Sequence, residues 1–158
     1  MEQIIIPFES SNLGRVDFDV SVMTSDLKSF RAVRFKLDSG SDFTTVDCED
    51  LQNLGYTRDF LKNCPAHPSN VSTASGDMKL RFIKNVTIKF GDREIQGCRI
   101  YFALDTQLRS LFGSDILKYF NRNIDYDDEL LRLTQRKNMP LLSEGETPLQ
   151  IYSVEEKQ

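Results

Sequence analysis

The feature that most constrains this chain is a glycine turn that carries a carboxylate, Asp38-Ser39-Gly40. Residues 30–37 before it alternate apolar and polar side chains, and residues 43–46 after it favour extended backbone. A strand, a sharp turn and a second strand hold a carboxylate rigidly at the bottom of a groove, which suits acid–base chemistry. The tripeptide alone is a weak signal, because Asp and Gly are common in turns for backbone reasons.

Length, composition and charge limit the classes of protein to consider. With 158 residues, of which 39% are hydrophobic and 28% charged, the chain is typical of one soluble globular domain with a proper core. A net charge of −4 gives no broad basic surface for nucleic acid. No apolar run approaches the roughly 20 residues that cross a bilayer. We therefore expect neither nucleic acid nor membrane as a partner.

Cysteine usage indicates the compartment. Cys48, Cys64 and Cys98 are odd in number and irregularly spaced, which argues against a disulfide framework. The N-terminus lacks a basic segment followed by a long apolar stretch, so no secretory signal is expected. These observations predict a cytoplasmic protein.

Alternating apolar residues and turn residues predict many short strands and a few short helices. The predicted strands lie at residues 3–8, 16–22, 28–37, 43–46, 78–90, 95–104, 124–126 and 130–133. Pro7 places the first strand at a sheet edge, because proline cannot donate to a ladder. Two helices follow caps at Asp47 and Thr57, and a third begins at Ser114 or Asp115 and runs to Phe120. Such elements indicate a mostly-β, barrel-like domain.

The domain is expected to span residues 1–136. The remaining residues, 137–158, are polar and contain two prolines, so we expect a tail that is ordered only where something holds it.

Three motifs, in this order along the chain, resemble those of the retropepsin-like aspartic proteases, the family of retroviral proteases and their cellular and bacterial relatives. Residues 37–42, Leu-Asp-Ser-Gly-Ser-Asp, resemble the catalytic loop, and residues 73–76, Thr-Ala-Ser-Gly, resemble the tip of the flap. Residues 111–117, Leu-Phe-Gly-Ser-Asp-Ile-Leu, resemble the segment and short helix that pack beside the catalytic loop. The resemblance covers about residues 16–133 and implies a closed β-barrel of one lobe with short helices.

The resemblance implies a role for each matching residue of the loop. Asp38 is the catalytic carboxylate, and Ser39 lies where a hydroxyl bonds across a dimer below the carboxylates. Gly40 lets the backbone approach the substrate closely, and its carbonyl accepts a substrate amide. Asp42 is the second acid of the loop, which contacts the substrate backbone.

The neighbouring positions support this site. Ala74, Ser75 and Gly76 cover the substrate from the flap, as the resemblance implies. Ser41, from its place in the loop, is predicted to donate a hydrogen bond to the carboxylate of Asp38 and to favour its charged form.

One residue departs from the family pattern. Ser114 stands where the family often has an arginine, which meets the second acid of the loop and helps to hold the dimer. Asp42 therefore needs another partner, for which Arg109 and Arg122 are the candidates.

Hydrolysis by this route needs two carboxylates about 3 Å apart that share one proton. One acts as a base on water, and the protonated one hydrogen-bonds the scissile carbonyl. Because the chain contains one Asp-Ser-Gly, an enzyme of this class must be a homodimer in which each subunit contributes Asp38. The sequence thus predicts a homodimeric aspartic endopeptidase with no metal or cofactor, whose partners are a second copy and an extended peptide or protein substrate.

Other interpretations stay open from the sequence. Asp38 could serve a catalytically silent peptide-binding or dimerisation module of the same fold, or a small β-barrel of another lineage. Asp42 could satisfy backbone amides, and residues 73–77 could form an ordinary hairpin turn. Cys64 and His67 have a spacing that suits zinc, but no second closely spaced pair exists.

Fold position alone suggests further roles. Val46, Ile83, Leu111 and Phe112 are the expected walls of apolar substrate pockets. The tail, residues 137–158, is longer than a single-lobed protease needs, so it could supply dimer strands or occlude the groove.

Overall fold

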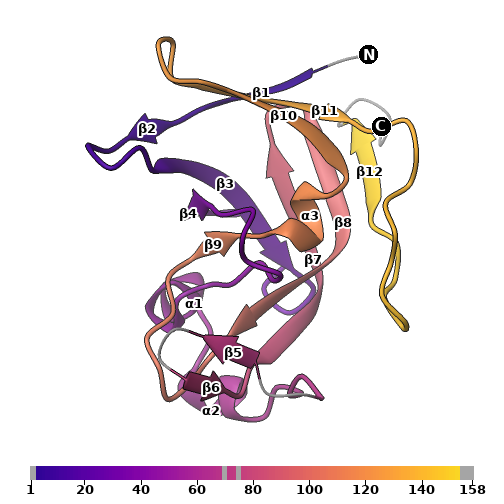
Figure 1. Ribbon diagram of the computed structural model, residues 1–158. Helices are drawn as coiled ribbons and strands as arrows, with labels where there is room; N and C mark the ends of the chain where they lie inside the picture. Colours follow the sequence, from indigo (N-terminus) through magenta and orange to yellow (C-terminus); the bar gives the residue numbers. More distant parts are fainter. Residues whose placement is uncertain (1–2, 69–70, 74–75, 154–158) are drawn as a thin grey trace.

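The computed structural model describes residues 3–68, 71–73 and 76–153, which are mostly β-structure (Figure 1). The strands are β1 (Gln3–Pro7), β2 (Glu9–Ser10), β3 (Val16–Thr24), β4 (Arg31–Leu37), β5 (Val71–Thr73), β6 (Gly76–Met78), β7 (Arg81–Phe90), β8 (Arg93–Phe102), β9 (Leu111–Phe112), β10 (Phe120–Asp125), β11 (Leu130–Gln135) and β12 (Gln150–Ser153). The helices are short: α1 (Cys48–Leu54), α2 (Arg58–Lys62) and α3 (Ser114–Leu117).

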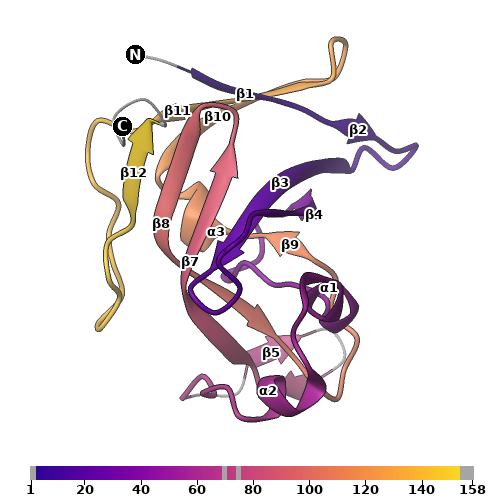
Figure 2. The ribbon, with the colours of Figure 1, turned by 180° about the vertical axis from the view of Figure 1, so that it is seen from behind.

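The main sheet has the strand order β12-β8-β7-β3-β4-β9, with β2 added beside β3. Its pairs are antiparallel except β4 with β9, which run parallel. The long strands β3, β7 and β8 curve, so the sheet curls around its contents (Figures 1 and 2). This confirms the mostly-β architecture with few short helices, and the named strands form a curled half-barrel.

The predicted strand at residues 43–46 is wrong, although this segment does connect β9, at one end of the main sheet, with β8. Thr45 exchanges hydrogen bonds with Leu111 of β9, while Thr44 and Val46 bond to Tyr101 of β8. On each side, the segment therefore forms a single isolated bridge at Thr45 and not a ladder of paired residues. This pairing is too short to make residues 43–46 a strand.

Phe112 lies in the core and fixes β9 at its place at the end of the main sheet, beside β4. Its ring packs edge-on against Phe18, Phe35 and Phe90, with ring centroids 5.4, 5.6 and 6.1 Å away. Edge-to-face packing of this kind favours a specific geometry in addition to burying apolar area. The position of β9, and of the residues that follow it, is therefore set by the core.

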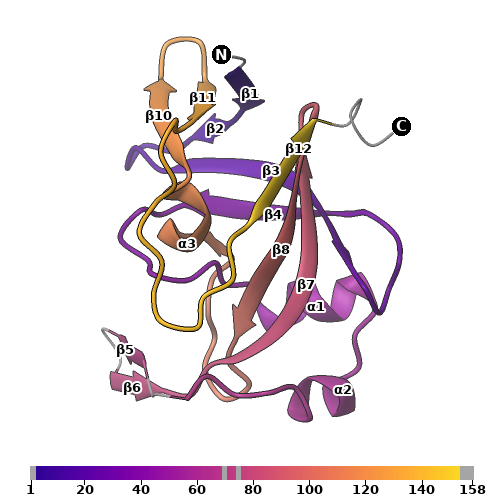
Figure 3. The same cartoon turned by 90° about the vertical axis from the view of Figure 1, so that its right-hand side faces the viewer.

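A second sheet, with the order β1-β11-β10, covers one end of the core. Its buried residues are Ile4 and Ile6 of β1, Phe120 of β10, and Leu131 and Leu133 of β11. The prediction that Pro7 lies in an edge strand is confirmed, since β1 pairs only with β11. Figure 3 shows this sheet at one end of the molecule and the hairpin β5–β6 at the other, with α3 between them.

Two of the three predicted helices are confirmed with their caps. Asp47 accepts a hydrogen bond from the Glu49 N–H at the start of α1, and Thr57 accepts one from the Phe60 N–H at the start of α2. α1 ends at Gly55, which has a left-handed φ of 114°. Within the described ranges, no helix has the length and apolar character of a membrane span.

The third helix differs from the prediction. α3 is capped by Gly113 without a side-chain bond and ends at Leu117, so neither Ser114 nor Asp115 is its cap. Phe120 begins β10, where pairing with β11 takes the place of further helical turns.

Residues 137–153 pack against their own chain. Strand β12 pairs antiparallel with β8, and Lys118 forms an ion pair with Glu146 at 2.8 Å. The Tyr119 hydroxyl accepts a hydrogen bond from the Leu149 N–H. The contacts that hold the described part of the tail thus come from β8 and from the residues just after α3, while the domain boundary at residue 136 stays a prediction.

Candidate active site

Asp38 lies directly after β4, half-buried, in a turn that its own carboxylate stabilises. Its backbone N–H donates to the Phe112 carbonyl at 3.0 Å, which ties the end of β4 to β9. The Asp38 Oδ1 accepts a hydrogen bond from the Gly40 N–H at 3.1 Å, and the Asp38 carbonyl accepts one from the Ser41 N–H. Asp side chains commonly bond backbone two residues on in such turns. The carboxylate is therefore held by local bonds and remains accessible.

Gly40 approaches this carboxylate closely. A Cβ placed on Gly40 would lie 3.3 Å from the Asp38 Oδ1. Both Ser39 and Gly40 are exposed, and the Ser39 hydroxyl has no hydrogen-bond partner in the part of the chain that the structure describes. These positions are open to a second molecule.

The prediction for Ser41 is wrong. Its hydroxyl donates to the Phe43 carbonyl at 2.7 Å, and a hydroxyl has only one proton to donate. Ser41 therefore closes the far side of the loop and does not bond the Asp38 carboxylate.

The segment after β9 lies against the back of the loop and leaves no room for a side chain at Gly113. A Cβ there would lie 2.4 Å from the Phe43 carbonyl oxygen and 2.9 Å from that of Ser41. The next residue, Ser114, donates its N–H to the Ser41 carbonyl at 2.8 Å. Glycine is needed at 113 for this close approach, since its φ of −99° is available to any residue.

A side-chain bond completes the contact between the two segments. The Asp115 carboxylate accepts hydrogen bonds from the Thr44 hydroxyl at 2.6 Å and the Thr44 N–H at 3.1 Å. A third comes from the Ile116 N–H at 3.0 Å. The Thr44 hydroxyl oxygen in turn accepts a bond from the Gly113 N–H at 3.1 Å. We call this group of Thr44, Gly113 and Asp115 the loop clamp.

Burial raises the pKa of Asp115 in the loop clamp. Desolvation raises the pKa of Asp115 from 3.8 to about 6, even though the bonds from Thr44 and the backbone N–H groups act in the opposite direction. Sequence reasoning missed Asp115 and Thr44 as site residues. Asp115 stands in the Gly-Ser-Asp motif, but its sequence position suggested a helix cap.

Within the described residues of a single chain, neither Arg109 nor Arg122 pairs with Asp42, so a pairing in the dimer stays a prediction. Asp42, Arg109 and Arg122 are all exposed, and none of the ion pairs within residues 3–68, 71–73 and 76–153 joins them. Asp42 also accepts no backbone amide bond in those ranges, so its carboxylate faces solvent.

A hairpin lies at the position predicted for the flap. β5 pairs with β6 through Thr73 and Gly76, and Gly76 has a φ of 109° that favours glycine. Ala74 and Ser75 lie outside the described residues. The hairpin is consistent with a flap and with an ordinary turn, so the substrate role of these residues stays a prediction.

The predicted pocket walls are mostly core residues. Val46, Ile83 and Phe112 are buried and belong to the main hydrophobic core, so they do not line an open pocket here. Leu111 is half-buried.

An aromatic group lies next to the catalytic loop. Phe43 packs against Tyr101 and His67 at centroid distances of 4.6 and 5.2 Å.

Cys64, the cysteine whose spacing from His67 suits zinc, donates its thiol proton to the Phe60 carbonyl. Among the described residues, no three His, Cys, Asp or Glu side chains gather in a metal-binding group.

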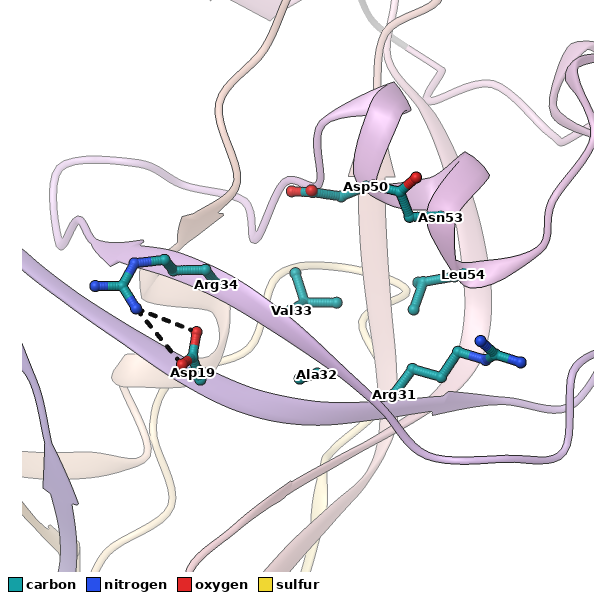
Figure 4. A pocket seen from close by; sticks show the side chains of 8 residues that line it. All are labelled: Asp19, Arg31, Ala32, Val33, Arg34, Asp50, Asn53 and Leu54. Atoms are coloured by element: carbon teal, nitrogen blue, oxygen red, sulfur yellow. Dashed lines mark hydrogen bonds and ion pairs between the residues drawn. The ribbon is translucent and has the colours of Figure 1, made fainter.

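A pocket of about 530 Å³ lies elsewhere, between the β3–β4 pair and α1 (Figure 4). Its polar walls include Arg34, which pairs with Asp19 across the strands, and Asp50 and Asn53 from α1. None of residues 38–42 lines it, so the pocket is separate from the catalytic loop.

Gly113→Ala should destabilise the protein by about 3 kcal/mol, since the new methyl group would overlap two backbone carbonyl groups that cannot rotate away. Gly40→Ala is the matched control, with an expected cost of about 1 kcal/mol or less, because its methyl group meets only a side-chain oxygen. Urea denaturation measures both. Equal costs for the two variants would contradict the close approach at Gly113.

The raised pKa of Asp115 predicts a specific pH dependence of stability. The folded state binds this proton more tightly than the unfolded state, so the resulting stabilisation is complete below a pH of 3.8 and is lost as the pH rises through about 6. The free energy of unfolding of the wild type, relative to Asp115→Asn, should fall by about 3 kcal/mol across that range. A difference between the two proteins that is constant with pH would contradict the shift.

Comparison with known proteins supports this geometry. A profile described as aspartyl protease matches residues 20–116. The crystal structure of a retropepsin-like aspartic protease from Rickettsia conorii is similar, with a TM-score of 0.59 and 25% sequence identity over 84% of this chain and 89% of that chain. No curated protein matches the chain. The fold, the loop and these two similarities show that the chain belongs to the aspartyl protease family and is retropepsin-like.

Proposed function

We propose that this protein is a homodimeric aspartic endopeptidase in which each subunit contributes Asp38. The observation that carries the proposal is the loop itself, in which a half-buried, accessible Asp38 stands at the end of β4 and is bonded to β9 and Gly40. The membership in the aspartyl protease family supports the reaction class. The chain contains one Asp-Ser-Gly, so the second carboxylate has to come from another copy.

The reaction follows from two carboxylates that share a proton. The ionised Asp38 takes a proton from a water molecule, whose oxygen attacks the scissile carbonyl carbon. The protonated Asp38 of the other subunit donates a hydrogen bond to the carbonyl oxygen and stabilises the developing charge. Collapse of the tetrahedral intermediate breaks the C–N bond as the first Asp38 gives the proton it took from water to the amine nitrogen. The residues that do this chemistry need no metal or cofactor.

The substrate is proposed to lie extended between the loop and the flap. The exposed Gly40 would offer its carbonyl to a substrate amide, and the unpaired Asp42 would bond the substrate backbone. Ala74, Ser75 and Gly76 would close over the substrate from the opposite side. Main-chain bonds of this kind give affinity, while side-chain pockets give specificity.

The surface that would meet the second copy includes Ser39. Its exposed hydroxyl is free within the described residues and would bond across the two-fold axis below the carboxylates. We propose residues 1–136 as the catalytic domain and residues 137–158 as a tail that adds to the dimer interface. The three cysteines are free, which supports a cytoplasmic location.

Asp38→Asn tests the enzyme directly. The variant keeps the shape of the side chain but cannot supply the shared acid pair, so we expect peptide cleavage to fall at least about a thousandfold with the dimer retained. Cleavage of a peptide library and sedimentation equilibrium measure the two properties. A dimeric wild type that cleaves no peptide from acid to neutral pH would contradict the proposal and favour a catalytically silent module.

Ser114→Arg tests the dimer surface. An arginine at this position resembles the family pattern and would give the exposed Asp42 a cationic partner, so we expect the dimer dissociation constant to fall about two- to tenfold. Ser114→Lys is the control, because lysine has the same charge but lacks the planar guanidinium group that can form two hydrogen bonds with a carboxylate. Its effect on the dissociation constant should be smaller. Sedimentation at several ionic strengths measures both. An unchanged dissociation constant for Ser114→Arg would show that Asp42 does not face this residue in the dimer.

A further inference from the structure

The loop clamp contains one ionisable side chain, Asp115. Hydrogen bonds connect the clamp to the segment that carries Asp38, the proposed catalytic carboxylate. Thr44 is fully buried, and its hydroxyl donates to Asp115 while accepting a bond from the Gly113 N–H. The residue before Gly113 is Phe112, whose carbonyl accepts the bond from the Asp38 N–H. The Asp115 carboxylate is thus linked to Asp38 through the Thr44 hydroxyl, the Gly113 N–H and the carbonyl of the preceding Phe112.

We propose that Asp115 is the positioning residue of the catalytic loop, and that turnover at Asp38 requires its carboxylate to be ionised. This inference rests on the proposed protease function. Asp115 touches neither substrate nor reacting atoms, and it acts through Thr44 and Gly113.

The donors around Asp115 explain why the ionised form fits. Oδ1 accepts bonds from the Thr44 hydroxyl and the Ile116 N–H, and Oδ2 accepts one from the Thr44 N–H. Three of the four lone-pair positions of the carboxylate accept these bonds, so a proton has the second position on Oδ2 left to occupy. A neutral carboxyl is a weaker acceptor, because hydrogen bonds to an ionised group are roughly twice as strong as those to a neutral one. The bonds of the loop clamp are therefore weakened when Asp115 takes up a proton.

Among the described residues, no ion pair joins Asp115 to a cation. Cys98 and Tyr101 of β8 lie near it, and its charge helps to raise the pKa of both. Lys118, which follows α3, is paired with Glu146. Burial and the three hydrogen bonds therefore set the protonation of Asp115, whose pKa is raised to about 6 because desolvation outweighs the bonds.

Nuclear magnetic resonance tests the positioning role without any cleavage assay. In the Asp38→Asn protein, which has no ionising dyad, the amide signals of Thr44 and Ile116 should titrate with a midpoint near pH 6. They should not titrate in Asp38→Asn combined with Asp115→Asn. Thr44 and Ile116 amide signals that do not move between about pH 5 and pH 7 in the first protein would overturn the inference.

Kinetics test the effect on turnover. Because small displacements of a catalytic group are costly, Asp115→Asn and Thr44→Val should lower kcat about ten- to a hundredfold with little change in KM. Asp115→Asn should also lose the acid limb of the kcat profile near pH 6, and Thr44→Ser, which restores the hydroxyl, should recover most of the activity. A variant Asp115→Asn with the wild-type kcat and acid limb would overturn the inference.

Asp125→Asn is the matched control for the kinetics. Asp125 also accepts a backbone N–H, from Asp128, and bonds Arg132, but it lies at the tip of the β10–β11 hairpin. Its profile should equal that of the wild type, and a lost acid limb in Asp125→Asn would contradict a specific role for Asp115. A wild type that cleaves nothing would refute the proposed function and the turnover part together, whereas the amide titration still decides whether Asp115 positions the loop.

Discussion

The close contact between the catalytic loop and the segment after β9 is the constraint on which the site depends. Gly113 lies so near the Phe43 and Ser41 carbonyls that no side chain fits, and backbone bonds on both sides hold the segments together. The contact in turn rests on Phe112, which three other phenylalanines fix in the core. The orientation of Asp38 is therefore determined by packing of the whole domain, which is what a preorganised catalytic group requires.

Each chain holds one Asp38, which is half of the acid pair in the proposed dimer. In the proposed homodimer, a two-fold axis would relate the two Asp38 carboxylates, so each chain would present its carboxylate in the same way. The exposed Ser39, Gly40 and Asp42 are then positions that a second copy or a substrate can satisfy. Activity would depend on chain concentration, because a monomer holds only one member of the acid pair. Two like carboxylates at close range also titrate as a pair, so their pKa values belong to the dimer.

Helix caps could be predicted from the sequence, whereas contacts between distant segments and the conformation of the catalytic loop could not. The caps Asp47 and Thr57 act on N–H groups two or three residues away, so their sequence signals are reliable. The bond from Thr44 to Asp115 joins residues 71 positions apart, and the same acid at a helix start suggested a cap. The acceptor of Ser41 was misassigned because the conformation of the folded loop, which the sequence does not reveal, directs its hydroxyl to the Phe43 carbonyl.

The distance between the two Asp38 carboxylates in a crystal structure of the dimer with a bound transition-state peptide analogue tests the central claim most directly. The account predicts that the two side chains meet on the two-fold axis with oxygens about 3 Å apart, close enough to share a proton. Carboxylates more than about 6 Å apart in every two-fold assembly would contradict it, because their charges would no longer be coupled strongly enough to hold that proton.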